Sequence, residues 1–188
     1  MMPPIHPLGA AIAIFFVTAL ASILWWMLHP PAHIPLAIAR ARQSVASVKR
    51  ILVPTIGLPY AERGVELACR LGLAQKAEIL LTYVMEVPRT MPLGIQLIEA
   101  EKNANEVLDR AEAIVELHHL QSEKIFQRAR LAGEEISKIA QKRNVDMIVL
   151  GVRPKKGLRG EIFGKTSDSI LRHAPCEVII ATLPDSGT

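Results

Sequence analysis

Residues Val145–Asp168 read VDMIVLGVRPKKGLRGEIFGKTSD, and they contain the clearest structural pattern in the chain. The apolar run VDMIVL is short and contains several β-branched side chains, which predicts a buried strand. Glycines and basic residues follow it, and a helix is then expected from Thr166 to His173, ending before Pro175. A strand, a glycine-rich loop and a helix in this order place backbone N–H groups where an anion can bind.

The chain beyond Lys49 repeats this alternation of strand and helix. Further strands are predicted at Ile51–Thr55, Ala77–Val84, Lys124–Arg130 and Glu177–Leu183, and further helices at Pro59–Leu73, Ile95–Leu120 and Gly133–Asn144. Because the helices that connect parallel strands cover both faces of a sheet, the pattern predicts an α/β domain with a five-stranded parallel sheet. The domain is expected to occupy residues 49–188.

The N-terminal segment Leu8–Leu28 contains no charged residue. A helix of that length is about 30 Å long, which is enough to cross the hydrocarbon core of a bilayer. Trp25 and Trp26 lie near its end, where indole rings favour the membrane interface. A cleaved signal peptide is the alternative, because Ala19–Ala21 resembles a cleavage site, but no charged residue precedes the segment and the apolar run continues past that site. We therefore expect a tail and a retained transmembrane helix within residues 1–29.

The distribution of charge predicts the orientation of this helix. The first charged residue of the chain is Arg40, and Arg42, Lys49 and Arg50 follow it. Because positively charged residues stay on the cytoplasmic side, the α/β domain is expected in the cytoplasm and the N-terminus outside. Residues 30–48 are expected to form a proline-rich, basic juxtamembrane linker. Its second half either lies as a short helix on anionic lipid headgroups or is a plain solvated linker.

The composition argues against several classes of function. The net charge is only +4, from 22 basic and 18 acidic residues, and 4% of the residues are aromatic, so nucleic acid is not an expected partner. The two cysteines, Cys69 and Cys176, lack the spacing of a metal site and are expected to be buried thiols. Adjacent side chains on a helix point in different directions, so His118 and His119 are not expected to share a metal ion. No P-loop, nucleophile or zinc motif is present, so no catalytic residue is predicted.

Several segments of the chain carry a resemblance to a known family: ILVPTIG, VDMIVLG, the pattern G-x12-G from Gly151 to Gly164, and ILRHAPCEVII. From Lys49 to Leu183 the chain resembles the universal stress protein family. The resemblance implies a sheet ordered 3-2-1-4-5 and pairing of two domains through their last strands, here Glu177–Leu183. In an open parallel sheet, ligands bind outside the carboxyl ends of the strands where the strand order reverses. With the implied order, that crevice lies between the first and the fourth strands.

Nucleotide-binding members of this family carry glycines and a hydroxyl residue after the fourth strand, and an aspartate just after the first. The resemblance implies that a nucleotide would contact the matching positions, which are Gly57, Val84, Gly151, Arg153, Gly164, Lys165 and Thr166. This sequence departs from the family pattern where Pro154 replaces the middle glycine, Lys165 the hydroxyl residue and Ile56 the aspartate. Proline has no N–H to donate, so one backbone contact to a phosphate is lost. Either the cations of the loop compensate, or the loop is a solvated basic segment.

Two functions are compatible with these features. The first is a non-catalytic accessory or regulatory subunit of a membrane protein complex, such as a transporter or an electron-transfer assembly. Its helix would contact lipid and an integral membrane partner, and Thr18 and Ser22 with the neighbouring alanines give that helix a surface of small residues. The alternative is a sensor of stress or energy state that binds ATP or another adenine nucleotide. Weak ATP hydrolysis ranks last, because the sequence offers no general base for it.

Overall fold

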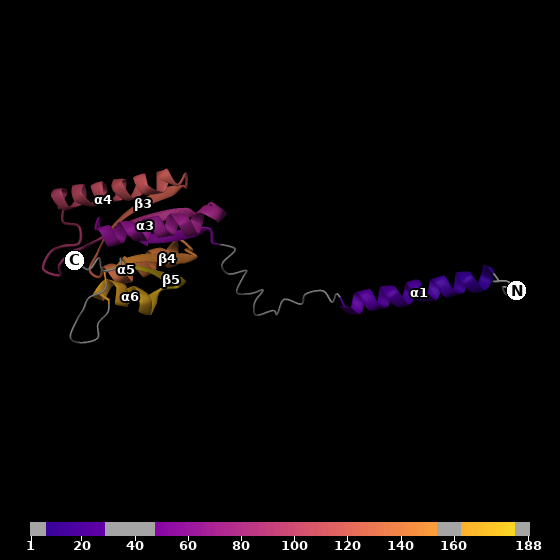
Figure 1. Cartoon of the computed structure of the whole chain (residues 1–188). Helices are drawn as coiled ribbons and strands as arrows, with labels where there is room; N and C mark the ends of the chain where they lie inside the picture. The colour runs from indigo at the N-terminus through magenta and orange to yellow at the C-terminus, as the bar shows by residue number, and fades with distance from the viewer. Residues whose placement is uncertain (1–6, 29–47, 154–162, 183–188) are drawn as a thin grey trace, which may run out of the picture. The chain divides into compact units, whose positions relative to one another are not determined.

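The computed structural model describes residues 7–28, 48–153 and 163–182. The chain divides into two compact units, Met1–Arg42 and Gln43–Thr188, which are described separately (Figure 1). The predicted linker, residues 30–48, lies outside the described ranges except for Val48, which is buried in the core of the second unit.

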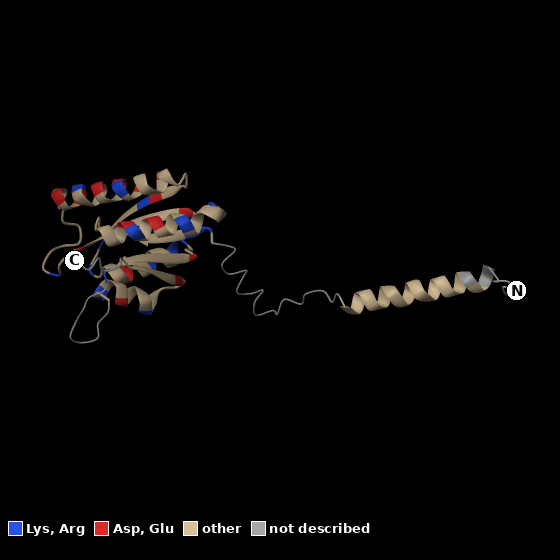
Figure 2. Cartoon of the chain, viewed as in Figure 1, with Lys and Arg blue, Asp and Glu red and all other residues tan. Residues whose placement is uncertain are grey.

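Within residues 7–28, the described part of the first unit, the chain forms the helix α1, which spans Pro7–Leu28. Figure 2 shows no acidic or basic residue along it. Its segment Ala11–Leu28 has a mean hydropathy of 2.2, and none of it is buried in the structure. The hydroxyl of Thr18 is satisfied within the helix, because Thr18 Oγ1 donates to the carbonyl oxygens of Ile14 and Phe15. By length and composition α1 can cross a membrane, and it shares both properties with signal sequences at the same position.

The second unit contains a five-stranded parallel sheet in the order β3-β2-β1-β4-β5, which confirms the predicted fold class and strand order. The strands are β1 (Arg50–Pro54), β2 (Glu78–Glu86), β3 (Ser122–Ala129), β4 (Met147–Val152) and β5 (Glu177–Thr182). The central strand β1 pairs Ile51 with Ile79 of β2 on one side and with Met147 of β4 on the other. The core side chains of β1 and β4 are apolar on both faces, as expected of strands covered from both sides.

Helices cover both faces of this sheet (Figure 1). They are α3 (Pro59–Gly72), followed by a short 3-10 helix η1 (Leu73–Gln75), α4 (Ile98–Leu117), α5 (Ala132–Lys142) and α6 (Lys165–His173). On one face, Val65 of α3 and Leu108 of α4 pack against Leu81 of β2. On the other face, Ile136 of α5 and Ile170 of α6 belong to a second apolar cluster.

The predicted boundaries shift by a few residues. Strand β2 continues past Val84 to Glu86, because β3 pairs with it as far as the register pair Glu86–Ala129. Helix α4 is shorter than the predicted Ile95–Leu120 at both ends. It ends at Leu117 because the next residues turn, with His119 at a φ of 54°. The predicted end of β5 at Leu183 lies outside the described residues.

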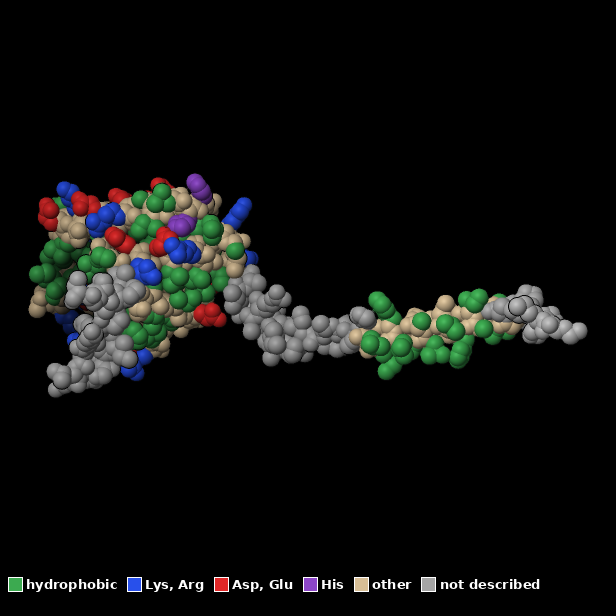
Figure 3. Space-filling model, viewed as in Figure 1, with side chains coloured by type: hydrophobic (Ala, Val, Ile, Leu, Met, Phe, Trp, Pro, Cys, Tyr) green, Lys and Arg blue, Asp and Glu red, His purple; other side chains and the backbone are tan. Residues whose placement is uncertain are grey.

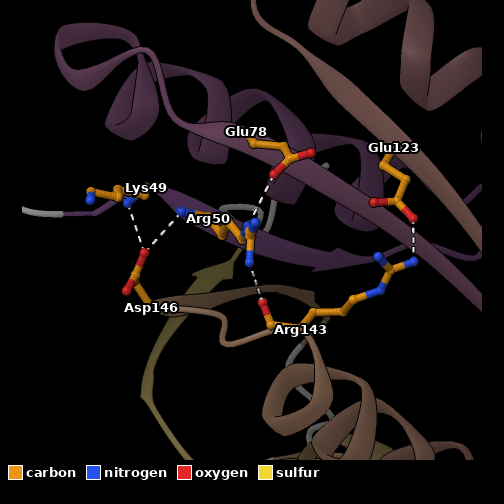
Figure 4. Close-up of polar contacts among 6 residues, drawn as sticks. All are labelled: Lys49, Arg50, Glu78, Glu123, Arg143 and Asp146. Atoms are coloured by element: carbon orange, nitrogen blue, oxygen red, sulfur yellow. Dashed lines mark hydrogen bonds and ion pairs between the residues drawn. The ribbon is translucent and has the colours of Figure 1, made fainter.

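A network of polar contacts holds the amino edge of the sheet, where the chain enters the domain (Figure 4). Asp146 Oδ2 accepts hydrogen bonds from the backbone N–H groups of Lys49 (2.7 Å) and Arg50 (2.9 Å). The Arg50 guanidinium donates to Glu78 and to the carbonyl oxygen of Arg143, whose own side chain pairs with Glu123. These contacts fix the starts of β1, β2, β3 and β4 against one another.

The two helices on the first face are linked by a second polar cluster. His118 Nε2 lies 2.8 Å from Glu66 Oε2, and Arg70 Nε donates to Glu66 Oε1 at 2.8 Å. The hydrogen bonds from His118 and then from Arg70 lower the pKa of the Glu66 carboxyl below its usual value of 4.5. A carboxyl whose pKa is depressed by folding stabilises the protein above its unfolded pKa, and that stability is lost as the pH falls through the folded pKa.

We therefore expect Glu66→Gln to remove stability at pH 7 and to flatten the acid limb of the stability curve below about pH 4.5. Because Glu66 is partly exposed, the loss should be less than about 1 kcal/mol. Urea unfolding between pH 7 and pH 3 measures both effects. Glu116→Gln, on the exposed side of α4, is the control. An acid limb identical in wild type and Glu66→Gln would show that this contact contributes nothing.

Candidate functional site

The candidate site lies at the carboxyl edge of the sheet, between the ends of β1 and β4. Thr55 directly follows β1, and its N–H donates to the carbonyl oxygen of Thr82 at 2.9 Å. Gly57 then turns the chain into α3 with a φ of 72°. A Cβ at Gly57 would lie 2.6 Å from Val107 Cγ2 and 2.6 Å from Arg110 Nη2, both on α4. Positive φ and close packing therefore both favour glycine at this turn.

Gly151, near the end of β4, has a packing role that its motif did not predict. A Cβ at this position would lie 1.9 Å from the carbonyl oxygen of Tyr60 and 2.7 Å from Ala61 Cα. A Cβ on Gly64 would in turn lie 2.8 Å from the Gly151 amide nitrogen. The first turns of α3 thus rest directly on the end of β4. Gly151 is required for this contact whether or not a phosphate binds beside it.

The N-terminus of α6 is the second element of the candidate site. Gly164 is the N-cap residue and supplies no side-chain cap, and Lys165 and Thr166 are exposed in the first turn. Asp168 in the same turn is engaged by Arg172 Nε at 2.9 Å, which lowers the pKa of the Asp168 carboxyl. The N-terminus of α6 therefore has no side-chain cap from Gly164, and Asp168 is engaged by Arg172, an arrangement that favours an anion.

Two exposed cations lie at the ends of β4 and α6 in the candidate site. Arg153 follows β4, and Lys165 begins α6. Neither forms an ion pair within the described part of the chain. Both were predicted as ligand contacts, and the structure leaves both side chains exposed to solvent. An unpaired cation beside a helix N-terminus strengthens the local positive potential.

Helix α6 is held in place by α5 and by a single buried side chain. Ile170 is the buried residue of α6, and it packs into the second apolar cluster. A Cβ at Gly133 of α5 would lie 2.6 Å from Ser169 Cβ and 2.8 Å from the carbonyl oxygen of Thr166. The close approach of α5 thus supports the first two turns of α6, which carry Lys165.

Val84 is half-buried near the carboxyl end of β2, on the face covered by α5 and α6. Two residues earlier on the same face lies Thr82, which is 1% exposed. No hydrogen-bond partner of Thr82 Oγ1 is found in the described part of the chain. Thr82 is not among the residues predicted from the sequence, although a threonine in an otherwise apolar strand end is a signal of a polar contact. A buried hydroxyl without a partner is costly, and Thr82 Oγ1 adds a polar group to this otherwise apolar face of β2.

Two of the positions at which the sequence departs from the nucleotide-binding pattern are Ile56 and Pro154, and only Ile56 lies in the described part of the chain. Ile56 occupies the turn after β1 and is 50% exposed, so no carboxylate stands at this point of the crevice. Pro154 lies outside the described residues. At residue 56 the candidate site therefore lacks a carboxylate that would accept hydrogen bonds from sugar hydroxyls.

Other candidate groups lie away from the crevice. Cys69 is buried as predicted, and burial raises the pKa of its thiol to about 11. Cys176 is only half-buried, which corrects the prediction of two buried thiols; it directly precedes β5, the last strand, at the edge of the sheet. His118 is engaged by Glu66, away from the crevice. No group of three or more metal-binding side chains occurs among the described residues.

Comparison with known proteins gives a consistent result. The sequence model of the "Universal stress protein family" matches residues 47–182. A protein of Methanothermobacter thermautotrophicus named "Universal stress protein" is 28% identical over 137 residues, which cover 69% of this chain and 92% of that protein.

Two solved structures share the fold at low sequence identity. A universal stress protein in complex with cAMP matches with a TM-score of 0.58 and 14% identity, over 72% of this chain and 97% of that one. The universal stress protein from Archaeoglobus fulgidus in complex with dAMP matches with a TM-score of 0.57 and 17% identity, over 72% of this chain and 98% of that one. At these identities the structural likeness establishes the fold alone.

Proposed function

Because this chain belongs to the universal stress protein family through residues 47–182, we propose that its α/β domain binds an adenine nucleotide in the crevice at the carboxyl edge of the sheet. The domain acts as a sensor: binding, and no chemical step, is its activity. The proposal draws on relatives of the same fold whose structures contain cAMP or dAMP.

The observation that carries this proposal is the state of the α6 N-terminus. Its first turn lacks a side-chain cap, its one carboxylate is engaged by Arg172, and the flanking cations Arg153 and Lys165 are unpaired among the described residues. Exposed N–H groups and cations together form a site for a phosphate group. The half-buried Val84 and the buried Thr82 lie on the face of β2 that α5 and α6 cover. In this proposal the adenine base lies against that face.

The same geometry predicts which part of the nucleotide dominates the affinity. With Ile56 in place of an acidic residue, the ribose hydroxyls lose a charged acceptor. Arg153 and Lys165 add positive charge on the phosphate side. We therefore expect affinity to rise with the number of phosphate charges, from AMP to ATP, and to fall with rising salt concentration.

Charge reversal at Lys165 tests the phosphate site. We expect Lys165→Glu to weaken nucleotide binding by about tenfold or more, because it removes a cation and places an anion at the helix N-terminus. Isothermal titration of the full chain in nanodiscs with AMP and ATP measures this effect. Lys142→Glu makes the same change of charge on an exposed side chain at the end of α5, at the amino edge, and serves as the control.

Two outcomes of this titration would contradict the proposal. Equal weakening by both variants would show that binding follows only the overall charge of the protein. If the wild-type protein gave no heat of binding at millimolar nucleotide and no shift in its thermal unfolding temperature, the proposal of a nucleotide sensor would be contradicted. A ligand present at one hundred times its dissociation constant should add about 2.7 kcal/mol of stability, which thermal unfolding detects easily.

A second proposal concerns α1, whose length and hydropathy support a membrane anchor. In this proposal the α/β domain is a regulatory subunit on the cytoplasmic side, and α1 contacts lipid and an integral membrane partner such as a transporter. We expect the full chain to stay in the membrane pellet after extraction at alkaline pH, and a chain lacking residues 1–29 to be released. Release of the full chain would contradict the anchor. If affinity purification in mild detergent returned only this chain, the proposal of an integral membrane partner would be contradicted.

A third element of the proposed function is pairing of two domains. Strand β5 lies at the edge of the sheet, and no further strand pairs with its outer side among the described residues. Its side chains Val178, Ile179 and Ile180 are only partly buried. An uncovered apolar edge strand favours association with a second copy. Ile179→Lys is expected to convert a dimer of the chain into a monomer, which analytical ultracentrifugation in detergent measures.

A further inference from the structure

An arginine of α4 lies against the turn that joins β1 to α3. A Cβ at Gly57 in this turn would lie 2.6 Å from Arg110 Nη2, so the guanidinium lies directly against the backbone of the turn. Arg110 is exposed, and it forms no ion pair within the described part of the chain. Figure 3 shows basic side chains, in blue, on the surface that α3 and α4 form. The end of β1 in the candidate site therefore carries an unpaired positive charge.

The side chain that precedes this glycine is apolar. Ile56 is 50% exposed, and because consecutive Cα atoms are 3.8 Å apart, the Arg110 guanidinium lies within about 8 Å of the Ile56 Cα. Glu62 in the first turn of α3 and Glu106 one turn before Arg110 on α4 form no ion pair with it among the described residues. The positive charge of Arg110 is thus not neutralised by a carboxylate in contact with it.

This turn adjoins the proposed phosphate site. A Cβ at Gly151 would lie 1.9 Å from the carbonyl oxygen of Tyr60, so the start of α3 rests on the end of β4. Tyr60 follows Gly57 closely in the chain, and Arg153 follows Gly151 closely. One contact between neighbouring elements therefore separates the cation at the end of β1 from the cation at the end of β4.

The charge beside a ribose decides which nucleotide an open α/β sheet accepts. An acidic side chain accepts hydrogen bonds from a free ribose hydroxyl, whereas a nearby arginine accommodates a phosphate on the ribose. A guanidinium also binds phosphate oxygens with two parallel hydrogen bonds. The turn after β1 has Ile56 and the guanidinium of Arg110, so its chemistry suits a ribose phosphate better than a free hydroxyl.

We propose that the nucleotide bound by this domain carries a second phosphate, at the 2′ or 3′ position of its ribose, and that Arg110 binds this phosphate. The inference rests on the proposed nucleotide site and adds its specificity. The 5′-phosphate lies at the N-terminus of α6 beside Lys165, and the ribose phosphate lies at the end of β1. Ile56 takes part by placing no carboxylate there that would repel the second phosphate.

Isothermal titration of the full chain in nanodiscs of zwitterionic lipid tests this inference. The probes are AMP, ATP, adenosine 3′,5′-bisphosphate and its 2′,5′ isomer. We expect Arg110→Gln to weaken binding of at least one bisphosphate by about tenfold or more, and to weaken AMP and ATP by less than about threefold. ATP serves as the probe for total charge, because all of its phosphates lie on the 5′ side. Lys142→Gln removes an exposed cation at the end of α5 and should leave every affinity as in wild type.

A substitution at Ile56 tests the same specificity in the opposite direction. Ile56→Asp places a carboxylate at the end of β1, so we expect it to bind the bisphosphate about tenfold or more weakly and AMP at least as tightly as wild type. Ile56→Asn is the uncharged control and should keep most of the bisphosphate affinity. Because Ile56 and Arg110 are exposed, thermal unfolding should change little in these variants.

The outcomes separate this inference from the nucleotide site on which it rests. If wild type binds AMP but neither bisphosphate more tightly than AMP, the inference is overturned and the nucleotide site remains. The same conclusion follows if Arg110→Gln weakens ATP as much as the bisphosphates, because Arg110 would then contact a 5′-polyphosphate. If none of the probes binds to wild type, both the inference and the nucleotide site are overturned.

Discussion

Gly151→Ala is expected to destabilise the α/β domain by about 3 kcal/mol or more, enough to leave much of it unfolded at 37 °C. The added methyl group would lie 1.9 Å from the Tyr60 carbonyl oxygen and 2.7 Å from Ala61 Cα. Both neighbours are backbone atoms of α3, so relief requires the helix to move away from β4. Such a shift would also separate α3 from the sheet at the crevice.

The matched control for this substitution is Gly164→Ala. A Cβ at Gly164 meets no described atom within 4 Å, and its φ of −73° suits alanine. We expect a change of less than about 0.5 kcal/mol there. Chemical denaturation of the full chain in detergent, followed by circular dichroism, measures both. If Gly151→Ala were as stable as Gly164→Ala, the contact between α3 and β4 would be wrong.

Ile170→Ala is expected to cost about 3 kcal/mol and to abolish nucleotide binding. Helix α6 has nine residues and buries only this side chain, which is 1% exposed, among its described residues. Its truncation leaves a cavity in the second apolar cluster and loosens the helix from the sheet. Because α6 carries Lys165 and the exposed N–H groups of the phosphate site, the loss of packing and the loss of binding should appear together.

The neighbouring substitution Leu171→Ala separates these effects from a general loss of apolar surface. Leu171 is 40% exposed on the same helix, so we expect a loss below about 1 kcal/mol and unchanged nucleotide affinity. Binding is measured by titration at a temperature where both variants are folded. An Ile170→Ala protein that binds nucleotide as tightly as Leu171→Ala would show that α6 does not form part of the site.

The fold was predictable because its signals are local or carried by distinctive segments. Strands and helices differ in the spacing of their apolar residues, so each element can be recognised in the sequence. The alternation of strands with helices then predicts a parallel sheet. The strand order came from the resemblance in segments such as VDMIVLG, and the structure confirms it. The ends of the elements were less predictable. The apolar stripe of α4 continues to His118 in sequence, but the turn at His119 ends the helix before it.

The site was only partly predictable from the sequence. Its glycines and cations follow from a motif, and the structure brings Gly57, Gly151 and Lys165 to the same edge of the sheet. The contact of Gly151 with Tyr60 depends on how closely a helix approaches a strand distant in sequence, which spacing does not reveal. Two other features also depend on neighbours that are distant in sequence. They are the Thr82 hydroxyl, which has no described partner, and the hydrogen bond from Arg130 to the carbonyl oxygen of Val87.

The most direct measurement is a crystal structure of the chain grown with dAMP, solved to a resolution that shows the ligand. The account predicts the base against Val84 and the phosphate at the N-terminus of α6, within hydrogen-bond distance of Lys165. An empty crevice at saturating dAMP, or a nucleotide bound at any other place on the domain, would contradict it.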